Sequence, residues 1–179
     1  QEEDLRAILL EQGIIIQGDE GFIPGEGAVL SFSRQSSTSL RYLFVAHESF
    51  HGLYFTHPEY RAEMHRLYTS MDARAVDFLE SYFTVIKSLG YDRSDQFLME
   101  NECMAYTLQQ SLGRVSPYFS GTLHERFLRH GGSPVLAEYI DETKAADFVA
   151  LAQALESYVY GKWGIAGGRV GLWYTRAAQ

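Results

Sequence analysis

Two histidines and a glutamate form the segment of the sequence that is most informative about chemistry. The residues His47-Glu48-Ser49-Phe50-His51 have the form H-E-x-x-H. On a helix, positions i and i+4 lie on one face, so both imidazoles can bind one metal ion. A catalytic zinc ion takes three protein ligands and leaves one position for water, whose proton a neighbouring carboxylate can accept. The segment therefore predicts that His47 and His51 bind Zn²⁺ and that Glu48 is a general base.

The residues around the motif predict a buried helix that positions it. Ser37, Thr38 or Ser39 can cap a helix that runs from Leu40 to about Phe55. The apolar residues of this stretch form a broad face, which is typical of a helix packed into a core. The two histidines are therefore expected on a rigid element.

The remaining patterns predict an α+β fold that is mostly helical. A short helix is expected at residues 2–12, because its apolar residues have helical spacing and Gly13 follows. A small, mainly antiparallel N-terminal sheet is expected from short β-prone pieces at Ile14–Gln17, Gly21–Ile23 and Ala28–Phe32. Residues 114–132 are expected to be less regular. The other expected helices are Pro58 to Tyr68, Asp72 to Leu89, Ser94 or Asp95 to about Leu112, and Ser133 or Pro134 to about Tyr160 with a break near residues 141–143.

A third metal ligand must come from elsewhere in the chain, because two histidines do not complete such a site. Two glutamates, Glu100 and Glu102, lie in one predicted helix. Residues two apart on a helix point in different directions, so only one of them can face the metal. The other is expected to be a solvated helix residue.

The residues Asn101, Glu102 and Ala105 match an Asn-Glu-x-x-Ser/Ala pattern. With H-E-x-x-H, the chain resembles the gluzincin metallopeptidases over residues 40–55 and 95–112, since a second helix of that family carries this pattern. The resemblance implies a zincin-like fold with an H-E-x-x-H helix and a glutamate-bearing helix. It also implies that Glu102 is the third zinc ligand and that the activity is zinc-dependent hydrolysis of peptide bonds.

Two further groups are candidates for catalysis. Hydrolysis needs a donor that stabilises the oxyanion, and gluzincins typically use a Tyr or a His from elsewhere in the chain. Tyr106, one turn after Glu102, and His124, downstream of the glutamate helix, are the candidates. Tyr106 also stands where the thermolysin-like branch has an aspartate that orients a zinc-binding histidine, so the orienting partner in this chain is left open.

Two alternatives remain. His57 lies where the metzincin peptidases have their third histidine, although Tyr54 replaces the glycine that lets the metzincin helix turn sharply. The site could also belong to a non-catalytic zinc-binding or interaction domain, but a structural site has no need of Glu48 as a base. His65 and His130 have no motif around them and are expected at the surface.

Composition limits the partners. The 179 residues, 46% of them hydrophobic, predict one domain over residues 1–179, and the start at Gln1 is typical of a processed chain or of part of a longer polypeptide. A net charge of −8 without a basic run argues against nucleic acid, and no apolar run approaches the roughly 20 residues of a membrane span. The expected partner is a peptide or protein substrate, and an extended substrate could pair with the segment Ala28–Ser33.

The lone Cys103 is expected in the core and leaves the compartment open, including a secreted or periplasmic one. The oligomeric state is also open.

Overall fold

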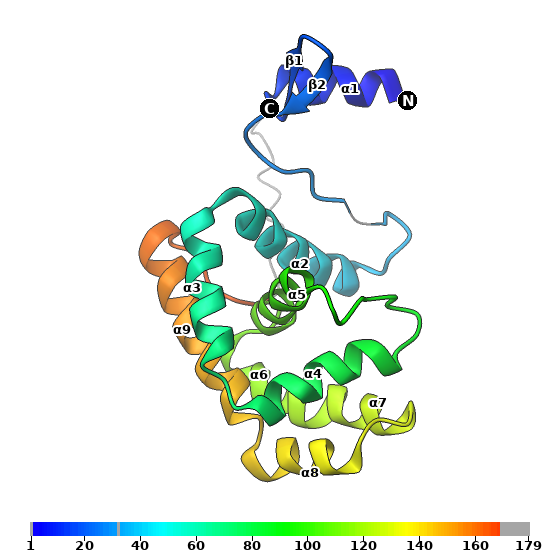
Figure 1. Cartoon of the computed structure of the whole chain (residues 1–179), viewed down its shortest axis with the longest axis vertical. Coiled ribbons are helices and arrows are strands. Elements are labelled where there is room, and N and C mark those ends of the chain that lie inside the picture. Colours follow the sequence, from blue (N-terminus) through cyan, green and yellow to red (C-terminus); the bar gives the residue numbers. More distant parts are fainter. Residues whose placement is uncertain (1, 32, 169–179) are drawn as a thin grey trace, which may run out of the picture.

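The computed structural model describes residues 2–31 and 33–168. They form a small N-terminal part and a larger helical body, joined by an extended segment (Figure 1). The body is built from the following elements: α2 (Thr38–Thr56), α3 (Pro58–Thr69), α4 (Ala73–Val85), α5 (Gln96–Leu108), α6 (Leu112–Pro117), the π-helical turn η1 (Tyr118–Leu123), α7 (His124–Arg129), α8 (Pro134–Thr143) and α9 (Ala146–Trp163). The prediction of a mostly helical α+β fold is confirmed.

The N-terminal part is a helix followed by a β-hairpin. Helix α1 (Glu2–Glu11) precedes β1 (Ile15–Gly18) and β2 (Gly21–Pro24), which pair antiparallel with Gly18 opposite Gly21. Gly21 has a φ of 139°, a conformation that glycine adopts without the clash of a Cβ atom. The predicted short helix and small antiparallel sheet are therefore confirmed.

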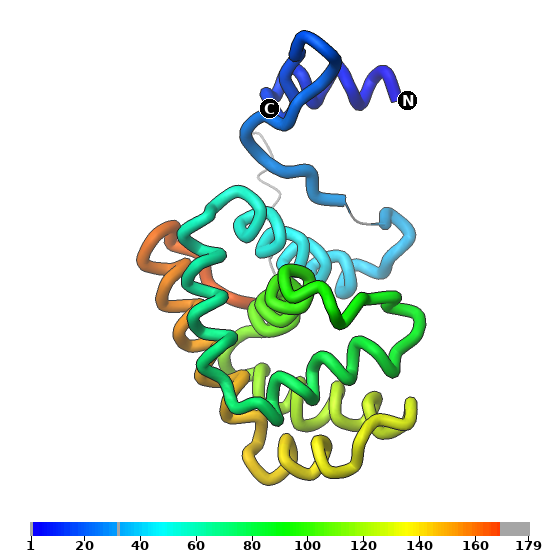
Figure 2. The backbone as a smooth tube through the Cα atoms, viewed as in Figure 1, coloured from blue at the N-terminus to red at the C-terminus, as the bar shows by residue number. Residues whose placement is uncertain are grey.

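The prediction of a third strand at Ala28–Phe32 is wrong for the residues that are described. Residues 28–31 form no strand, and Phe32 lies outside the described residues. The segment leaves the hairpin and passes along α2 (Figure 2), where the side chain of Leu30 lies beside Gly52. A strand needs a neighbouring strand for its backbone hydrogen bonds, and this segment packs beside a helix instead.

Polar residues set the starts of the principal helices, as expected. Ser37, Asp72 and Asp95 stand directly before α2, α4 and α5, and the side chain of each accepts a hydrogen bond from a backbone N–H of the first turn. Pro58 is the first residue of α3, where its missing N–H leaves no helical hydrogen bond unmade. These local signals position both helices of the predicted site.

Two predicted helix ends are wrong, and a segment expected to be less regular is mostly helical. Helix α4 ends at Val85 and α5 ends at Leu108, each four residues before the predicted end. Of residues 114–132, expected to be less regular, residues 114–129 are helical as parts of α6, η1 and α7. The predicted break in the last helix is confirmed: it lies at Lys144 and Ala145, whose φ values are 52° and 56°.

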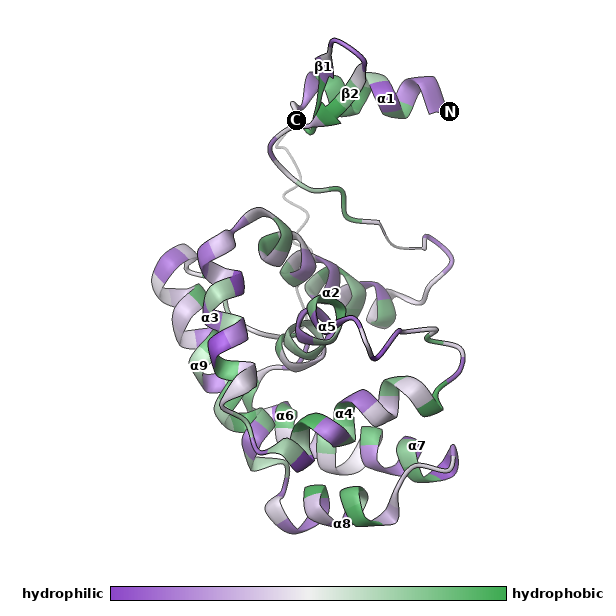
Figure 3. Ribbon diagram, viewed as in Figure 1, coloured by the Kyte–Doolittle hydropathy of each residue, from purple (hydrophilic) through white to green (hydrophobic). Residues whose placement is uncertain are grey.

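Helix α5 lies at the centre of the body and packs against α2, α3 and α9. Nine of its 13 residues are buried, among them Glu100, Asn101 and Glu102. The outer helices α3, α4 and α8 carry both hydrophobic and polar residues (Figure 3), as expected for helices with one buried and one solvated face. The buried polar residues of α5 need hydrogen-bond or ion-pair partners inside the body, because water does not reach them.

In the described part of the chain, no helix combines the length and the apolar character that crossing a membrane requires.

Candidate metal centre

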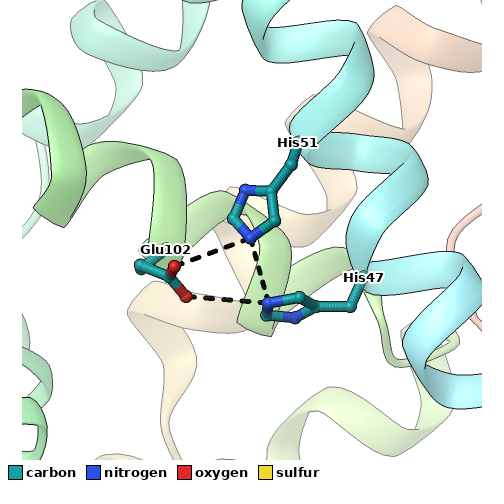
Figure 4. Close-up of side chains that lie close together, drawn as sticks. All are labelled: His47, His51 and Glu102. Atoms are coloured by element: carbon teal, nitrogen blue, oxygen red, sulfur yellow. Dashed lines mark hydrogen bonds and ion pairs between the residues drawn. The ribbon is translucent and has the colours of Figure 1, made fainter. Parts of the chain in front are cut away.

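Helix α2 brings the two motif histidines together. The Nε2 atoms of His47 and His51 lie 3.0 Å apart, and the rings meet edge to face with their centroids 4.6 Å apart (Figure 4). Both rings point from α2 toward α5. One helical turn therefore gives the two imidazole nitrogens that the motif predicts.

Helix α5 adds a carboxylate to this pair. The Oε2 atom of Glu102 lies 3.6 Å from Nε2 of His47, and its Oε1 atom lies 3.6 Å from Nε2 of His51. Tetrahedral zinc with bonds of about 2.0–2.1 Å would place its ligand atoms about 3.3–3.4 Å apart. The spacings of 3.0 Å and 3.6 Å lie on either side of this value, so the three groups are close enough to bind one metal ion.

The carboxylate is buried without a full set of partners. Glu102 is 6% exposed, and its Oε2 atom has no hydrogen-bond partner among the described residues. A buried carboxylate oxygen is costly unless a positive group or a donor faces it. Together with the two imidazole nitrogens, this carboxylate forms a set of electron-pair donors that suits zinc. A cation bound between them would give the unpartnered oxygen an interaction partner.

Side-chain amides orient both imidazoles. The Oδ1 atom of Asn101 lies 2.8 Å from Nδ1 of His51, and the Oε1 atom of Gln109 lies 3.2 Å from Nδ1 of His47. A carbonyl oxygen can only accept, so each Nδ1 carries the proton and each Nε2 presents its lone pair to the cluster. The orienting partner that the sequence left open is therefore an amide for each histidine.

Burial shifts the pKa of two groups of this cluster, His47 and Glu102. The pKa of His47 is lowered to about 4, first by burial and then by the charge on His51, against a hydrogen bond to Gln109 that raises it. At neutral pH the imidazole of His47 is therefore uncharged. The pKa of Glu102 is raised, first by burial, although the charge on His51 and a side-chain hydrogen bond with Tyr91 lower it.

Glu48 opens onto the same cavity as His47, His51 and Glu102. The cavity has a volume of about 300 Å³, and the other residues that line it are Asn101, Tyr91, Gly52, Phe55, Leu98 and residues 28–30. The next residue on the helix after His47 thus faces the space beside the cluster. A carboxylate at this place can accept a proton from a water molecule bound in the cavity.

The other predicted catalytic residues lie differently. The ring of Tyr106 packs edge-on against the ring of His47, with centroids 5.4 Å apart, and it does not line the cavity. The structure does not bring His124 to the site: it is the first residue of α7, and it does not line the cavity. Helices α7 and α8 lie at the end of the body away from α2 (Figure 1). The helical segment formed by α6, η1 and α7 leads the chain to this end.

His57 is not brought to the histidine pair either. Helix α2 continues through Tyr54 to Thr56, so the chain does not turn back toward the cluster. The ring of His57 instead lies 4.7 Å from the ring of Trp163. Within residues 2–31 and 33–168, the groups that could hold a metal ion together are His47, His51 and Glu102.

Glu100 occupies the opposite face of α5. The expectation that it is solvated is wrong, because it is 4% exposed and bonds to Nδ1 of His65 and Nε2 of Gln96, both at 2.8 Å. His65 is exposed at the surface as expected, and so is His130. Cys103 is buried in the core, as predicted.

No family model, no curated protein and no solved structure matches this chain.

Sequence reasoning missed three residues of the site. Tyr91 stands alone in the loop between α4 and α5, with no motif to mark it. Gln109 lies seven residues after Glu102, two helical turns along the same face, so helical periodicity could have found it. Tyr118, which hydrogen-bonds to Gln109, comes from a turn that was not predicted to be helical.

Proposed function

We propose that the protein is a zinc-dependent peptidase. The observation that carries the proposal is the convergence of His47, His51 and Glu102 within 4.8 Å of one another, beside a cavity that Glu48 also lines. Two imidazoles and one carboxylate are the ligand set of catalytic zinc sites that keep a position for water. A site that served only to hold the fold together would have no use for a carboxylate facing this cavity.

Each residue of the site has its own role in the proposed reaction. Zinc bound by the three ligands would supply a Lewis acid that polarises the scissile carbonyl and increases the acidity of water. Glu48 accepts the proton of the attacking water and delivers it to the nitrogen of the leaving amine. Asn101 and Gln109 hold the imidazoles so that Nε2 stays directed at the metal.

Tyr91 is the phenol that we assign to the oxyanion. It lines the cavity with Glu48 and Glu102, whereas Tyr106 and His124 do not. Burial, and next the charge of Glu102, raise the pKa of Tyr91. The phenol therefore keeps its proton and can donate a hydrogen bond to the developing negative charge.

The substrate path follows the segment that passes along α2. Ala28, Val29 and Leu30 line the metal cavity, and the backbone of residues 28–31 makes no backbone hydrogen bond to other described residues. An extended peptide can pair with such free N–H and C=O groups. A second, mainly apolar cavity of about 320 Å³ lies beside Gly52 and gives room for an apolar side chain of the peptide.

The test separates metal binding from hydrolysis. Glu48→Gln should keep zinc at one ion per chain and lose at least about 100-fold in peptide hydrolysis, because the amide cannot accept the proton. Glu138→Gln, the same change at an exposed position of α8, should leave both unchanged. Zinc content is measured by metal analysis, and hydrolysis by mass spectrometry on a mixture of unstructured peptides.

The outcomes decide between the functions. Undiminished hydrolysis by Glu48→Gln would refute the role of this residue. A wild-type protein that binds zinc and cleaves no peptide would support the non-catalytic alternative. His57→Ala should leave zinc content unchanged, and a loss of zinc would instead support the metzincin ligand set.

A further inference from the structure

A chain of hydrogen bonds leads from His47 away from the metal centre. Its Nδ1 atom lies 3.2 Å from Oε1 of Gln109, and Nε2 of Gln109 donates to the hydroxyl of Tyr118 at 2.9 Å. The three residues come from α2, from the end of α5 and from the start of η1. Gln109 is 4% exposed, so its amide has little access to water.

The direction of each bond follows from the groups present. The Nε2 group of a glutamine can only donate, and the hydroxyl of Tyr118 accepts it. The amide oxygen of Gln109 is then left to face His47, and it can only accept. The proton of the imidazole is therefore held on Nδ1, and the lone pair on Nε2 is directed at Glu102 and His51.

The backbone fixes the positions of the residues in this hydrogen-bond relay, which consists of His47, Gln109 and Tyr118. Gln109 directly follows α5 as its C-cap residue, and its N–H donates to the carbonyl of Ala105 at 2.9 Å. Tyr118 begins a π-helical turn directly after Pro117. Such turns are rare in proteins and are often found at functional sites. Here the turn places a phenol against the buried amide.

We propose that Gln109 and Tyr118 are positioning residues, which fix the tautomer and orientation of His47 through an uncharged relay. The inference rests on the proposed function, since it treats His47 as a metal ligand. The group bonded to Nδ1 of each histidine is a side-chain amide, of Gln109 for His47 and of Asn101 for His51, and an amide carries no charge. Glu102 would then be the one anionic group among the three residues that hold the ion, and a bound dication would keep a net positive charge with which to polarise a substrate carbonyl.

The relay predicts a graded series of metal affinities. Gln109→Leu keeps the volume but removes the acceptor, and it should weaken Zn²⁺ binding about 10- to 100-fold. Gln109→Glu restores an acceptor for Nδ1–H and should bind Zn²⁺ within about 3-fold of wild type. Tyr118→Phe removes only the outer bond and should weaken binding by less than about 10-fold. The control is Gln153→Leu, the same change at an exposed position of α9.

Two measurements are made on each variant. The dissociation constant for Zn²⁺ is obtained by competition with a chromophoric chelator, after circular dichroism has shown that the metal-free variant is folded. The tautomer of His47 is read from its ring ¹⁵N shifts in the metal-free protein. Wild type and Gln109→Glu should show the proton on Nδ1, and Gln109→Leu should show a mixture.

Each outcome bears on the relay. Wild-type affinity and an unchanged tautomer in Gln109→Leu would overturn it, and so would equal losses in Gln109→Leu and Gln109→Glu. A wild-type protein that binds no Zn²⁺ would sink the proposed function. In that case the tautomer measurement still tests whether Gln109 directs the proton of His47.

Discussion

Replacing Glu102 by glutamine should make the metal-free protein more stable than metal-free wild type, and should leave it less stable than wild type when zinc is bound. In the metal-free protein the carboxylate is 6% exposed, and its Oε2 atom lacks a hydrogen-bond partner among the described residues. An unsatisfied buried polar group costs about 1–3 kcal/mol, and more when it is charged. Glu102→Gln removes the charge at the same volume, so the metal-free variant should be about 1–3 kcal/mol more stable than wild type.

Zinc should reverse this order. Free zinc at about 1,000 times its dissociation constant stabilises the folded state by about 4 kcal/mol. For a domain of this size each kcal/mol raises Tm by about 2–4 °C, so zinc should raise the Tm of wild type by about 8–16 °C. The variant has lost its anionic ligand, and zinc should raise its Tm by less than about 3 °C.

The assay is thermal unfolding followed by circular dichroism at about pH 8, with a chelator and then with zinc. The control Glu138→Gln, an exposed change of the same kind, should stay within about 0.5 kcal/mol of wild type in both conditions. A metal-free Glu102→Gln protein less stable than wild type would show that the protein itself satisfies the carboxylate. Equal zinc shifts in wild type and variant would show that Glu102 is not a ligand.

Three other predictions concern two positions, Gly52 and Asp72. Gly52→Ala should stabilise the protein by up to about 1 kcal/mol in thermal unfolding, because the new Cβ would lie 3.3 Å from the partly exposed end of Leu30, which can move aside. Gly52→Leu should instead raise KM for peptides with little change in kcat, since Gly52 borders both cavities; an unchanged KM would place the substrate elsewhere. Hydrogen bonds from the Arg74 side chain and from its backbone N–H lower the pKa of Asp72 to about 2. The stability that Asp72 gives is therefore present above its ordinary pKa of about 4 and is lost as the pH falls toward 2. Urea midpoints measured from about pH 5 to pH 2 should fall less steeply for Asp72→Asn than for wild type, and parallel slopes would contradict this.

The sequence predicts what depends on neighbours along the chain. Ser37, Asp72 and Asp95 cap helices because their side chains bond to N–H groups two or three residues away, a signal that needs no tertiary structure. The pairing of His47 with His51 depends only on one helical turn. The convergence of Glu102 on this pair is not local, and it was expected only from the resemblance to a family.

The errors lie where distant contacts decide. The segment 28–31 has the composition of a strand, but the hairpin offers it no partner and it packs beside α2. Residues 112–129 are helical despite Pro117, and this carries His124 away from the site. Tyr91 reaches the cavity from a loop whose path is set by α4 and α5, so no spacing in the sequence marks it.

A comparison of Glu100 and Glu102 in α5 shows which buried carboxylate has its partners inside the protein and which lacks one. Glu100 and Glu102 are almost equally buried, at 4% and 6% exposure, on one central helix. Glu100 is matched by His65 and Gln96, so partners inside the protein account for its burial. Glu102 keeps an oxygen without a hydrogen-bond partner and faces two imidazoles that amides hold with their lone pairs inward. Folding alone gives no reason to gather three electron-pair donors around one point, whereas a shared cation would satisfy all three.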